Sequence, residues 1–168
     1  MPVIQKKVCL LGDFAVGKTS LVRYFVEGIF DDRYLSTIGV KISRRSINRP
    51  YGELNLIIWD LAGSGEFSSW SSYLRGISGA LIVCDLTRRE TLDGFERYSD
   101  WVRQMNEAAP LIFIGNKVDL VDQRLISDAD LLSATEALGG EYFLSSAKTG
   151  EQVAASFLSL AGALDEQI

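Results

Sequence analysis

The segment Gly12–Thr19 reads Gly-Asp-Phe-Ala-Val-Gly-Lys-Thr and fits the pattern G-x-x-x-x-G-K-[ST]. It follows the apolar run Val8–Leu11 and precedes a stretch with helical character, so it predicts a strand, a glycine-containing loop and a helix. In that setting, backbone N–H groups of the loop surround the phosphates of a nucleotide, and the helix N-terminus adds its positive dipole end. Lys18 is expected to reach the β- and γ-phosphates, and Thr19 to ligate Mg²⁺. A chance glycine turn would not require this strand–loop–helix context.

A second motif indicates which base is bound. Asn116, Lys117 and Asp119 form N-K-x-D directly after the apolar run Leu111–Gly115. The Asp119 carboxylate can accept hydrogen bonds from N1–H and the exocyclic amine of guanine, which adenine cannot supply in that geometry. Asn116 can bond the N7/O6 edge, and the stem of Lys117 can lie along the base. A site built on such partners rejects a base that lacks them by roughly 10⁴-fold. N-K-x-D alone also fits a polar surface turn; together with a phosphate loop it predicts a guanine nucleotide.

Composition narrows the class of protein. The chain has 168 residues, a hydrophobic content of 47% and a net charge of −5, which argues against a general nucleic-acid binder. No apolar run approaches the ~18–20 residues of a membrane span. Cys9 and Cys84 lie in apolar runs, so we expect buried free thiols and a cytoplasmic protein. The chain has no histidine, which excludes histidine-based triads, general bases and metal sites.

Strand and helix patterns alternate along the chain, and no linker divides it, so we expect one domain over residues 1–168. The expected strands are Lys7–Leu11, Val40–Ile47, Leu54–Asp60, Ala80–Asp85, Leu111–Asn116 and Glu141–Leu144. The expected helices are Lys18–Val26, Phe67–Arg75, Arg89–Asn106, Ser127–Leu138 and Gln152–Leu164. The second and third strands are separated by a hairpin-like turn, and the others read as βα units of a mostly parallel α/β sheet. Ligands bind such sheets beyond the carboxyl ends of the strands, where all the motifs fall.

Two further segments complete the predicted site. Asp60 and Gly63 follow the strand Leu54–Asp60, so the carboxylate can hold Mg²⁺ through water and the Gly63 N–H can bond a γ-phosphate. Thr37 lies between the phosphate loop and this strand, and its hydroxyl can complete the Mg²⁺ shell while the γ-phosphate is present. Taken alone, Thr37 would be interpreted as a solvated loop threonine.

These motifs, in this order and spacing, resemble those of small GTPases of the Ras superfamily, closest to the Rab and Rho branches, over essentially the whole chain. The resemblance implies a small G domain of the P-loop NTPase class, with a six-stranded mostly parallel sheet (one antiparallel strand) and five helices. It also implies a molecular switch that binds Mg-GTP or GDP and hydrolyses GTP. Ser146-Ala147-Lys148 resembles the last guanine loop, with the Ala147 N–H at guanine O6. Phe30 matches the aromatic packed edge-on against the base, and Tyr34 the tyrosine that closes over the phosphates.

The resemblance implies three sets of site residues. Those at the nucleotide are Asp13, Phe14, Ala15, Val16, Gly17, Lys18, Thr19, Ser20, Phe30, Tyr34, Thr37, Gly63, Asn116, Lys117, Asp119, Ser146, Ala147 and Lys148. Those at the metal are Thr19, Thr37 and Asp60, and those expected to act in hydrolysis are Lys18, Thr37, Gly63 and Ser64.

Two departures from the family pattern bear on hydrolysis. The family usually carries a glutamine that orients the attacking water, and here the position is Ser64, whose side chain is too short to reach. Phe14 replaces a small residue and would crowd an arginine supplied by another protein, unless it simply packs over the neighbouring segment. Loss of a water-positioning group costs roughly 10–100-fold in rate, so we expect slow hydrolysis. The alternative is a GTP-binding scaffold with negligible hydrolysis; the guanine motif disfavours an ATP-using kinase or ATPase.

The resemblance implies partners at the hairpin and at two switch segments, switch I at Tyr34–Gly39 and switch II at Asp60–Tyr73. Effector and regulator proteins would meet Trp59, Trp70 and Tyr73 there, although Trp59 also fits a core position. We expect a monomer without a nucleic-acid partner. The final residues Asp165–Ile168 contain no cysteine or basic run, so we expect no lipid anchor in this chain. A truncated tail, a soluble switch such as a prokaryotic relative, or one domain of a longer polypeptide would each fit.

Overall fold

The computed structural model describes residues 2–31, 39–63 and 65–168, and in that part of the chain six strands form one sheet. The strands are β1 Val3–Gly12, β2 Val40–Arg49, β3 Gly52–Leu61, β4 Gly79–Asp85, β5 Leu111–Asn116 and β6 Glu141–Ser145. Their order across the sheet is β2-β3-β1-β4-β5-β6. Strand β2 runs antiparallel to β3, and every other neighbouring pair is parallel. The predicted α/β class and mixed sheet are confirmed.

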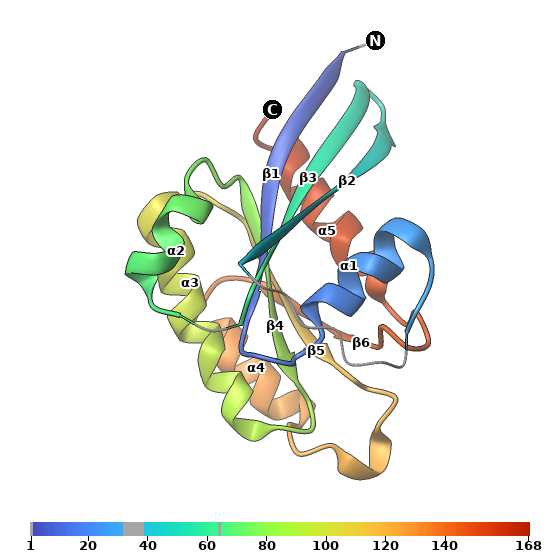
Figure 1. The fold of residues 1–168 in the computed structure, drawn as a ribbon, viewed down its shortest axis with the longest axis vertical. Helices are drawn as coiled ribbons and strands as arrows, with labels where there is room; N and C mark the ends of the chain where they lie inside the picture. Colours follow the sequence, from blue (N-terminus) through green and yellow to red (C-terminus); the bar gives the residue numbers. More distant parts are fainter. Residues whose placement is uncertain (1, 32–38, 64) are drawn as a thin grey trace.

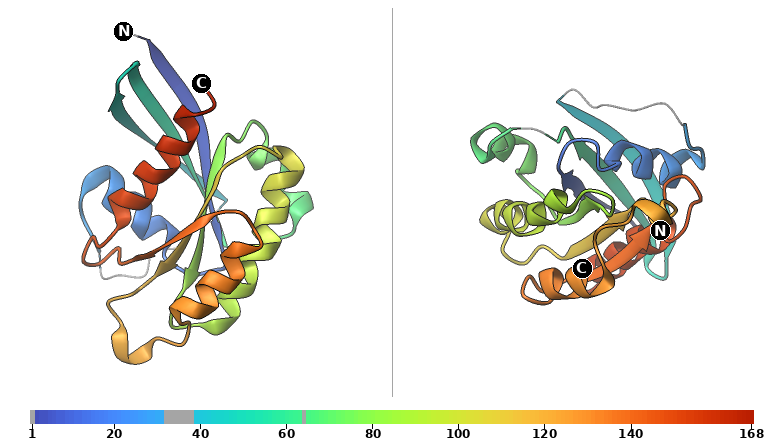
Figure 2. Two further views of the ribbon diagram at one scale, coloured as in Figure 1. Left: turned by 180° about the vertical axis from the view of Figure 1, so that it is seen from behind. Right: turned by 90° about the horizontal axis from the view of Figure 1, so that it is seen from below.

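Helices cover both faces of the sheet. The described residues form five α-helices: α1 Lys18–Glu27, α2 Phe67–Leu74, α3 Gly94–Met105, α4 Asp128–Glu136 and α5 Val153–Asp165. Two short 3₁₀ helices accompany them, η1 Arg89–Asp93 and η2 Val121–Gln123. Figures 1 and 2 show α1 and α5 on one face and α2, α3 and α4 on the other. This arrangement buries the near-continuous apolar strands that a parallel sheet requires.

Each face of the sheet has its own hydrophobic cluster. Successive side chains of β1 point to opposite faces, so Val8 and Leu10 join the cluster under α1 and α5, whereas Cys9 joins the other. In the first cluster, the rings of Phe25 and Phe157 stack with their centroids 4.1 Å apart. The two clusters fix the central strands from both sides, and the loops at the carboxyl ends of these strands are thereby held in place.

The structure differs from the sequence prediction at the ends of elements. Strand β1 begins at Val3, four residues before the predicted start, because Val3–Lys6 pair with β3 along their backbone although none of them is fully buried. The hairpin turn contains only residues 50–51, since Arg49 pairs with Gly52. The helix predicted from Arg89 begins as the 3₁₀ helix η1 and continues as α3.

The structure bears on the two cysteines and on the length of the helices. Cys9 and Cys84 are both free and fully buried, and burial raises the pKa of the Cys9 thiol to about 12. None of the helices in the described residues is long and apolar enough to cross a membrane.

Candidate nucleotide site

The predicted motifs meet at the carboxyl ends of the parallel strands. The loop after β1 lies beside the ends of β4 and β5 (Figure 1). Asp60 lies near the end of β3, which pairs with β1, and the loops after β5 and β6 adjoin each other because these two strands pair. The topology therefore brings together residues that are more than a hundred positions apart in the chain.

The backbone of the phosphate loop turns sharply at two residues with positive φ angles. Ala15 and Gly17 adopt positive φ angles of 64° and 102°. A side chain at Gly17 would also overlap the amide of Asn116, so glycine is required there on both grounds. Val16 is fully buried and anchors the loop in the core, and Ser20 lies in the first turn of α1.

Lys18 is a buried cation at the start of α1. Only 6% of it is exposed, and its Nζ donates to the backbone oxygens of Gly12, at 2.9 Å, and Asp13, at 3.1 Å. Burial lowers the pKa of Lys18 to about 8, partly opposed by the nearby carboxylates of Asp60 and Asp13. A buried cation on a loop of N–H groups can bind a phosphate group, whose charge would favour the protonated amine.

Two of the residues predicted to ligate the metal through an oxygen atom are in contact with each other. The Thr19 hydroxyl donates to Oδ2 of Asp60 at 2.6 Å, and Asp60 is only 1% exposed. Within the described residues, no three His, Cys, Asp or Glu side chains gather into a cluster that could hold a metal ion. Mg²⁺ suits such a site, since it prefers oxygen ligands and usually combines one or two protein groups with waters and substrate phosphates. The third predicted ligand, Thr37, lies outside the described residues.

The two predicted guanine loops are joined by a hydrogen bond. The hydroxyl of Ser146, after β6, donates to Oδ1 of Asp119, after β5, at 2.7 Å. Ala147 is 4% exposed, and Lys148 is exposed. The bond holds the Asp119 carboxylate at one orientation, with its second oxygen able to face a base.

Lys117 connects the guanine motif to the phosphate loop. Its Nζ donates to the backbone oxygen of Ala15 at 3.0 Å and forms an ion pair with Oδ2 of Asp85 at 2.8 Å. Lys117 has a φ of 72°, which turns the chain sharply after β5. The loop predicted to read the base and the loop predicted to bind phosphate are therefore held as one unit.

Asn116 connects the phosphate loop to β6. Its side chain is 2% exposed, and its amide nitrogen donates to the backbone oxygen of Val16 at 2.9 Å. Its amide oxygen accepts from the Ser145 hydroxyl at 3.2 Å. These contacts join the phosphate loop to β6 and use one of the two N–H donors of the Asn116 amide, so the expected bond to the N7/O6 edge of the base stays a prediction.

Sequence reasoning missed Asp85. This carboxylate is fully buried at the end of β4; its Oδ1 accepts from the N–H of Thr87 at 2.9 Å and from the Thr87 hydroxyl at 2.7 Å. The ion pair with Lys117 gives its other oxygen a partner. A signal was available, because Asp85 ends an apolar strand at the same sheet edge as Asp60 and Asn116.

Two arginines, also not predicted, bind the outer side of the phosphate loop. Arg97 donates to Oδ1 of Asp13 at 2.6 Å, and the Tyr98 hydroxyl donates to the same oxygen at 2.8 Å. Arg88 donates through Nη1 to the backbone oxygen of Phe14 at 2.8 Å. Several of the side chains that hold this loop thus come from the region after β4 and from α3.

Gly63 lies against the same part of the loop. A Cβ at Gly63 would overlap the backbone N and Cα of Phe14 and the carbonyl carbon of Asp13. The segment after β3 therefore approaches the loop where a γ-phosphate would be held. The Phe14 side chain is 55% exposed, and Phe30 is 37% exposed. Three other predicted site residues, Tyr34, Thr37 and Ser64, lie outside the described residues.

The aromatic residues predicted for the partner surface divide into two groups. Trp59 and Tyr73 are partly buried, with ring centroids 6.4 Å apart, and Nζ of Lys7 lies 3.6 Å from the centre of the Trp59 ring. Trp70 is only 6% exposed and belongs to the cluster under α2 and α3, so its expected place on an exposed partner surface is wrong. Helix α2 packs on α3 and turns this indole inward.

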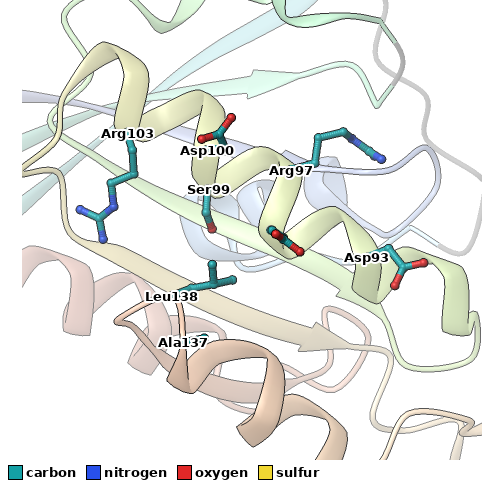
Figure 3. Close-up of a pocket in the computed structure, with 8 residues that line it drawn as sticks. Asp93, Arg97, Ser99, Asp100, Arg103, Ala137 and Leu138 are labelled. Carbon is teal, nitrogen blue, oxygen red and sulfur yellow. The ribbon is translucent and has the colours of Figure 1, made fainter.

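A separate pocket of about 580 Å³ lies between α3 and the end of α4 (Figure 3). Its lining residues are Asp93, Glu96, Arg97, Ser99, Asp100, Arg103, Ala137 and Leu138. In Figure 3, Ser99 points from α3 toward Leu138, whereas Arg97 extends away from the pocket. None of these lining residues belongs to the predicted motifs, so the pocket is distinct from the candidate nucleotide site.

Fold and site together define a P-loop nucleotide-binding domain. Residues 7–166 match the Ras family. The chain is 36% identical over 163 residues to the Ras-related protein Rab-21 of Geodia cydonium, covering 94% of this chain and 70% of that protein. It is 35% identical over 164 residues to the Ras-related protein RABD1 of Arabidopsis thaliana, covering 96% and 80%. Human Rab-21 is 34% identical over 160 residues, covering 92% and 69%. The chain therefore belongs to the Ras family, as a Rab-like small GTPase.

Proposed function

We propose that the chain is a molecular switch that binds Mg-GTP and GDP at the carboxyl edge of its sheet and hydrolyses GTP slowly. The observation that carries this proposal is the link between the two binding loops. Lys117 of the guanine motif donates to Ala15 of the phosphate loop at 3.0 Å, while Ser146 holds Asp119 at 2.7 Å. A nucleotide whose phosphates lie on one loop has its base presented to the other.

In this proposal the chain's own groups bind and orient GTP. Backbone N–H groups of the phosphate loop and the Lys18 amine hold the β- and γ-phosphates, and the Asp119 carboxylate accepts from guanine. Thr19, Asp60 and Thr37 would hold Mg²⁺, which supplies charge neutralisation at the β- and γ-phosphate oxygens. The Gly63 N–H bonds the γ-phosphate, so the segment after β3 differs between the GTP and GDP states.

Slow hydrolysis follows from Ser64. A serine side chain does not extend to the water that a glutamine would orient, and the loss of such a group costs roughly 10–100-fold. The alternative is a GTP-binding module that recruits effectors with negligible hydrolysis. In either case we expect partners on the hairpin and switch segments, where Trp59 and Tyr73 lie and where Ile42 of β2 is 50% exposed. We also expect a monomer in which residues 1–168 form one domain.

Two measurements test the function. Competition against a bound fluorescent GDP analogue should be effective with GDP or GTP and ineffective with ATP. Displacement by ATP at equal concentration would overturn the guanine-nucleotide assignment.

Single-turnover hydrolysis of loaded GTP should be slow in the wild type and about tenfold or more faster in Ser64→Gln. Ser64→Ala is the matched control, since it removes the hydroxyl without restoring an amide. A wild type that is fast without help would show that another group orients the water. No detectable turnover would favour the scaffold alternative.

A further inference from the structure

The carboxylate of Asp13 in the phosphate loop is bound to helix α3. Its Oδ1 accepts from Nη2 of Arg97 at 2.6 Å and from the hydroxyl of Tyr98 at 2.8 Å. Nη2 of Arg97 also donates to the Tyr98 oxygen at 3.1 Å, and the guanidinium carbon lies 4.7 Å from the centre of the Tyr98 ring. The three side chains therefore form a closed set of contacts between the phosphate loop and α3.

Gly94, the first residue of α3, leaves room for this contact. A Cβ at Gly94 would lie 2.9 Å from Cε2 of Tyr98 and 3.4 Å from Oδ1 of Asp13. The first distance is well inside the ~3.5–4.0 Å at which carbon atoms pack, so a side chain there would displace the Tyr98 ring. The approach of this ring to the loop therefore depends on glycine.

The Tyr98 hydroxyl is suited to donate a hydrogen bond permanently. Tyr98 is 6% exposed, and burial raises the pKa of its hydroxyl to about 12. The hydroxyl therefore stays protonated at neutral pH and donates to the Asp13 carboxylate. A hydrogen bond to a charged acceptor is about twice as strong as one between neutral groups.

The backbone of Asp13 connects this contact to the groups expected at the phosphates. The Asp13 carbonyl oxygen accepts from Nζ of Lys18 at 3.1 Å, while its carboxylate is bound to α3. A Cβ at Gly63 would lie 2.6 Å from the Asp13 carbonyl carbon, so the segment after β3 also contacts this residue. Lys18 and Gly63 are the residues expected to reach the β- and γ-phosphates. Asp13 is therefore fixed at the part of the loop that would serve those phosphates.

We infer that Arg97 and Tyr98 are positioning residues, which act through Asp13 to hold the phosphate loop in the shape that binds the β- and γ-phosphates. The inference rests on the proposed function. Neither side chain needs to touch the nucleotide, because both act on the loop through the Asp13 carboxylate. The loop is then ordered when the chain folds, and binding need not order it.

Arg97 has a second effect because Asp13 is negatively charged. A carboxylate on a loop that binds phosphate repels the phosphate unless a cation compensates for it. The Arg97 guanidinium forms an ion pair with this carboxylate, and the arginine side chain is 50% exposed. Removal of Arg97 would therefore loosen the loop and also make it more negative.

The number of phosphates on the ligand separates positioning from a general effect on folding. Dissociation constants should be measured by calorimetry for GMP, GDP and a non-hydrolysable GTP analogue. The variants to compare with the wild type are Tyr98→Phe, Gly94→Ala, Arg97→Ala, Asp13→Ala and Asp13→Asn. Tyr142→Phe is the matched control, because it removes a hydroxyl that donates to Asp128 at 3.2 Å, away from the phosphate loop.

We expect Tyr98→Phe and Gly94→Ala to weaken GDP and the GTP analogue by about threefold to tenfold, with GMP affinity within about twofold of the wild type. Arg97→Ala should weaken the same two nucleotides by about tenfold or more, most strongly at low salt. Asp13→Asn keeps an acceptor oxygen and should lose less than Asp13→Ala. Tyr142→Phe should match the wild type for all three nucleotides.

A double variant tests whether Tyr98 acts through Asp13. Tyr98→Phe should have no further effect on GDP affinity once Asp13→Ala is present, because its partner is already missing. Additive losses in the double variant would overturn the inference. Circular dichroism of each variant, which should overlay that of the wild type, excludes misfolding as the cause of a lost affinity.

The remaining outcomes separate this inference from the proposed function. Unchanged GDP affinity in Tyr98→Phe and Asp13→Ala would overturn the inference alone. Equal losses for GMP, GDP and the GTP analogue would do the same, because the contact would then only support the fold. A wild type without affinity for guanine nucleotides would overturn the proposed function, and this inference with it.

Discussion

At the scale of single residues, we expect base selection to depend on Asp119. Its carboxylate is oriented by Ser146 and is expected to accept from the N1–H and amine of guanine. In Asp119→Asn an amide replaces one acceptor with a donor, so we expect GDP affinity to fall by about 100-fold or more. Affinity for xanthosine diphosphate should rise, because xanthine offers an oxygen where guanine has its amine.

The exposed residue Asp122 in η2 provides the control for this substitution. Asp122→Asn removes the same charge three residues further along and should leave GDP affinity unchanged. Equal losses in both variants would show that the effect is one of net charge, and an unchanged Asp119→Asn would place base recognition elsewhere.

Lys18 should give nucleotide binding a pH dependence. Burial lowers its pKa to about 8 in the nucleotide-free chain, and bound phosphates favour its protonated form. We expect the protonated amine to bind the phosphates, so GDP affinity should be constant below about pH 8 and fall above it by up to about tenfold per pH unit. Dissociation constants measured between about pH 7 and about pH 9 check this.

Lys18→Arg is the comparison for that profile. A guanidinium stays charged throughout this range, so the variant should bind more weakly but with a flat pH dependence. A slope shared by both proteins would mean that a different group titrates.

At the scale of elements, the approach of the segment after β3 to the phosphate loop should distinguish GTP from GDP. A Cβ at Gly63 would overlap the backbone of Phe14, so Gly63→Ala must move this segment away from the loop. Overpacking of this kind costs about 1–3 kcal/mol. We expect GTP affinity to fall by roughly 5–150-fold, and GDP affinity to change little because GDP has no γ-phosphate for Gly63 to bind.

Gly162 in α5 allows a control of the same chemical type. A Cβ there meets no atom within 4 Å, so Gly162→Ala should leave both affinities unchanged and raise stability by up to about 1 kcal/mol. Titration of each variant with GDP and a non-hydrolysable GTP analogue measures both. Equal losses for the two nucleotides in Gly63→Ala would contradict the proposed role.

The sequence predicted which helices and strands form, but it did not predict the contacts between them. Apolar runs and motif spacing predicted the strands and the five helices. The phosphate loop and the guanine motif likewise marked most of the candidate site. The contacts of Arg88 and Arg97 with Phe14 and Asp13, however, join residues more than seventy positions apart. They depend on how α3 and the segment after β4 pack on β1, and no local pattern records that packing.

The same limit explains the revised interpretation of Trp70. Trp70 was expected on a partner surface, but the packing of α2 against α3 turns it inward to 6% exposure. Asn116 belongs to a motif that predicts base contact, and the motif does not reveal the hydrogen bonds that its amide makes with Val16 and Ser145. Motif spacing identifies which residues gather at a site, whereas burial decides which of their atoms are available.

At the scale of the whole molecule, the two hydrophobic clusters should determine stability. Phe157 of α5 is fully buried and stacks on Phe25 of α1, with the ring centroids 4.1 Å apart. Removing a buried aromatic ring costs about 3–5 kcal/mol, so Phe157→Ala should unfold at a much lower urea concentration. Unfolding is best followed at one fixed GDP concentration, because bound nucleotide itself adds stability.

The next residue in α5 serves as the reference. Leu158 is 43% exposed, and Leu158→Ala should change the free energy of unfolding by less than about 1 kcal/mol. If both variants unfolded alike, the cluster under α1 and α5 would not limit stability.

The phosphate loop is held from outside the site, by Asn116 and Lys117 after β5, by Arg88 after β4, and by Arg97 of α3. A loop that is already ordered loses little conformational freedom when a ligand arrives. Capture of a nucleotide should then be limited by diffusional encounter, and nucleotides should differ chiefly in how long they remain bound. The residence time of GDP, more than its rate of arrival, would therefore determine how quickly this chain can be reset.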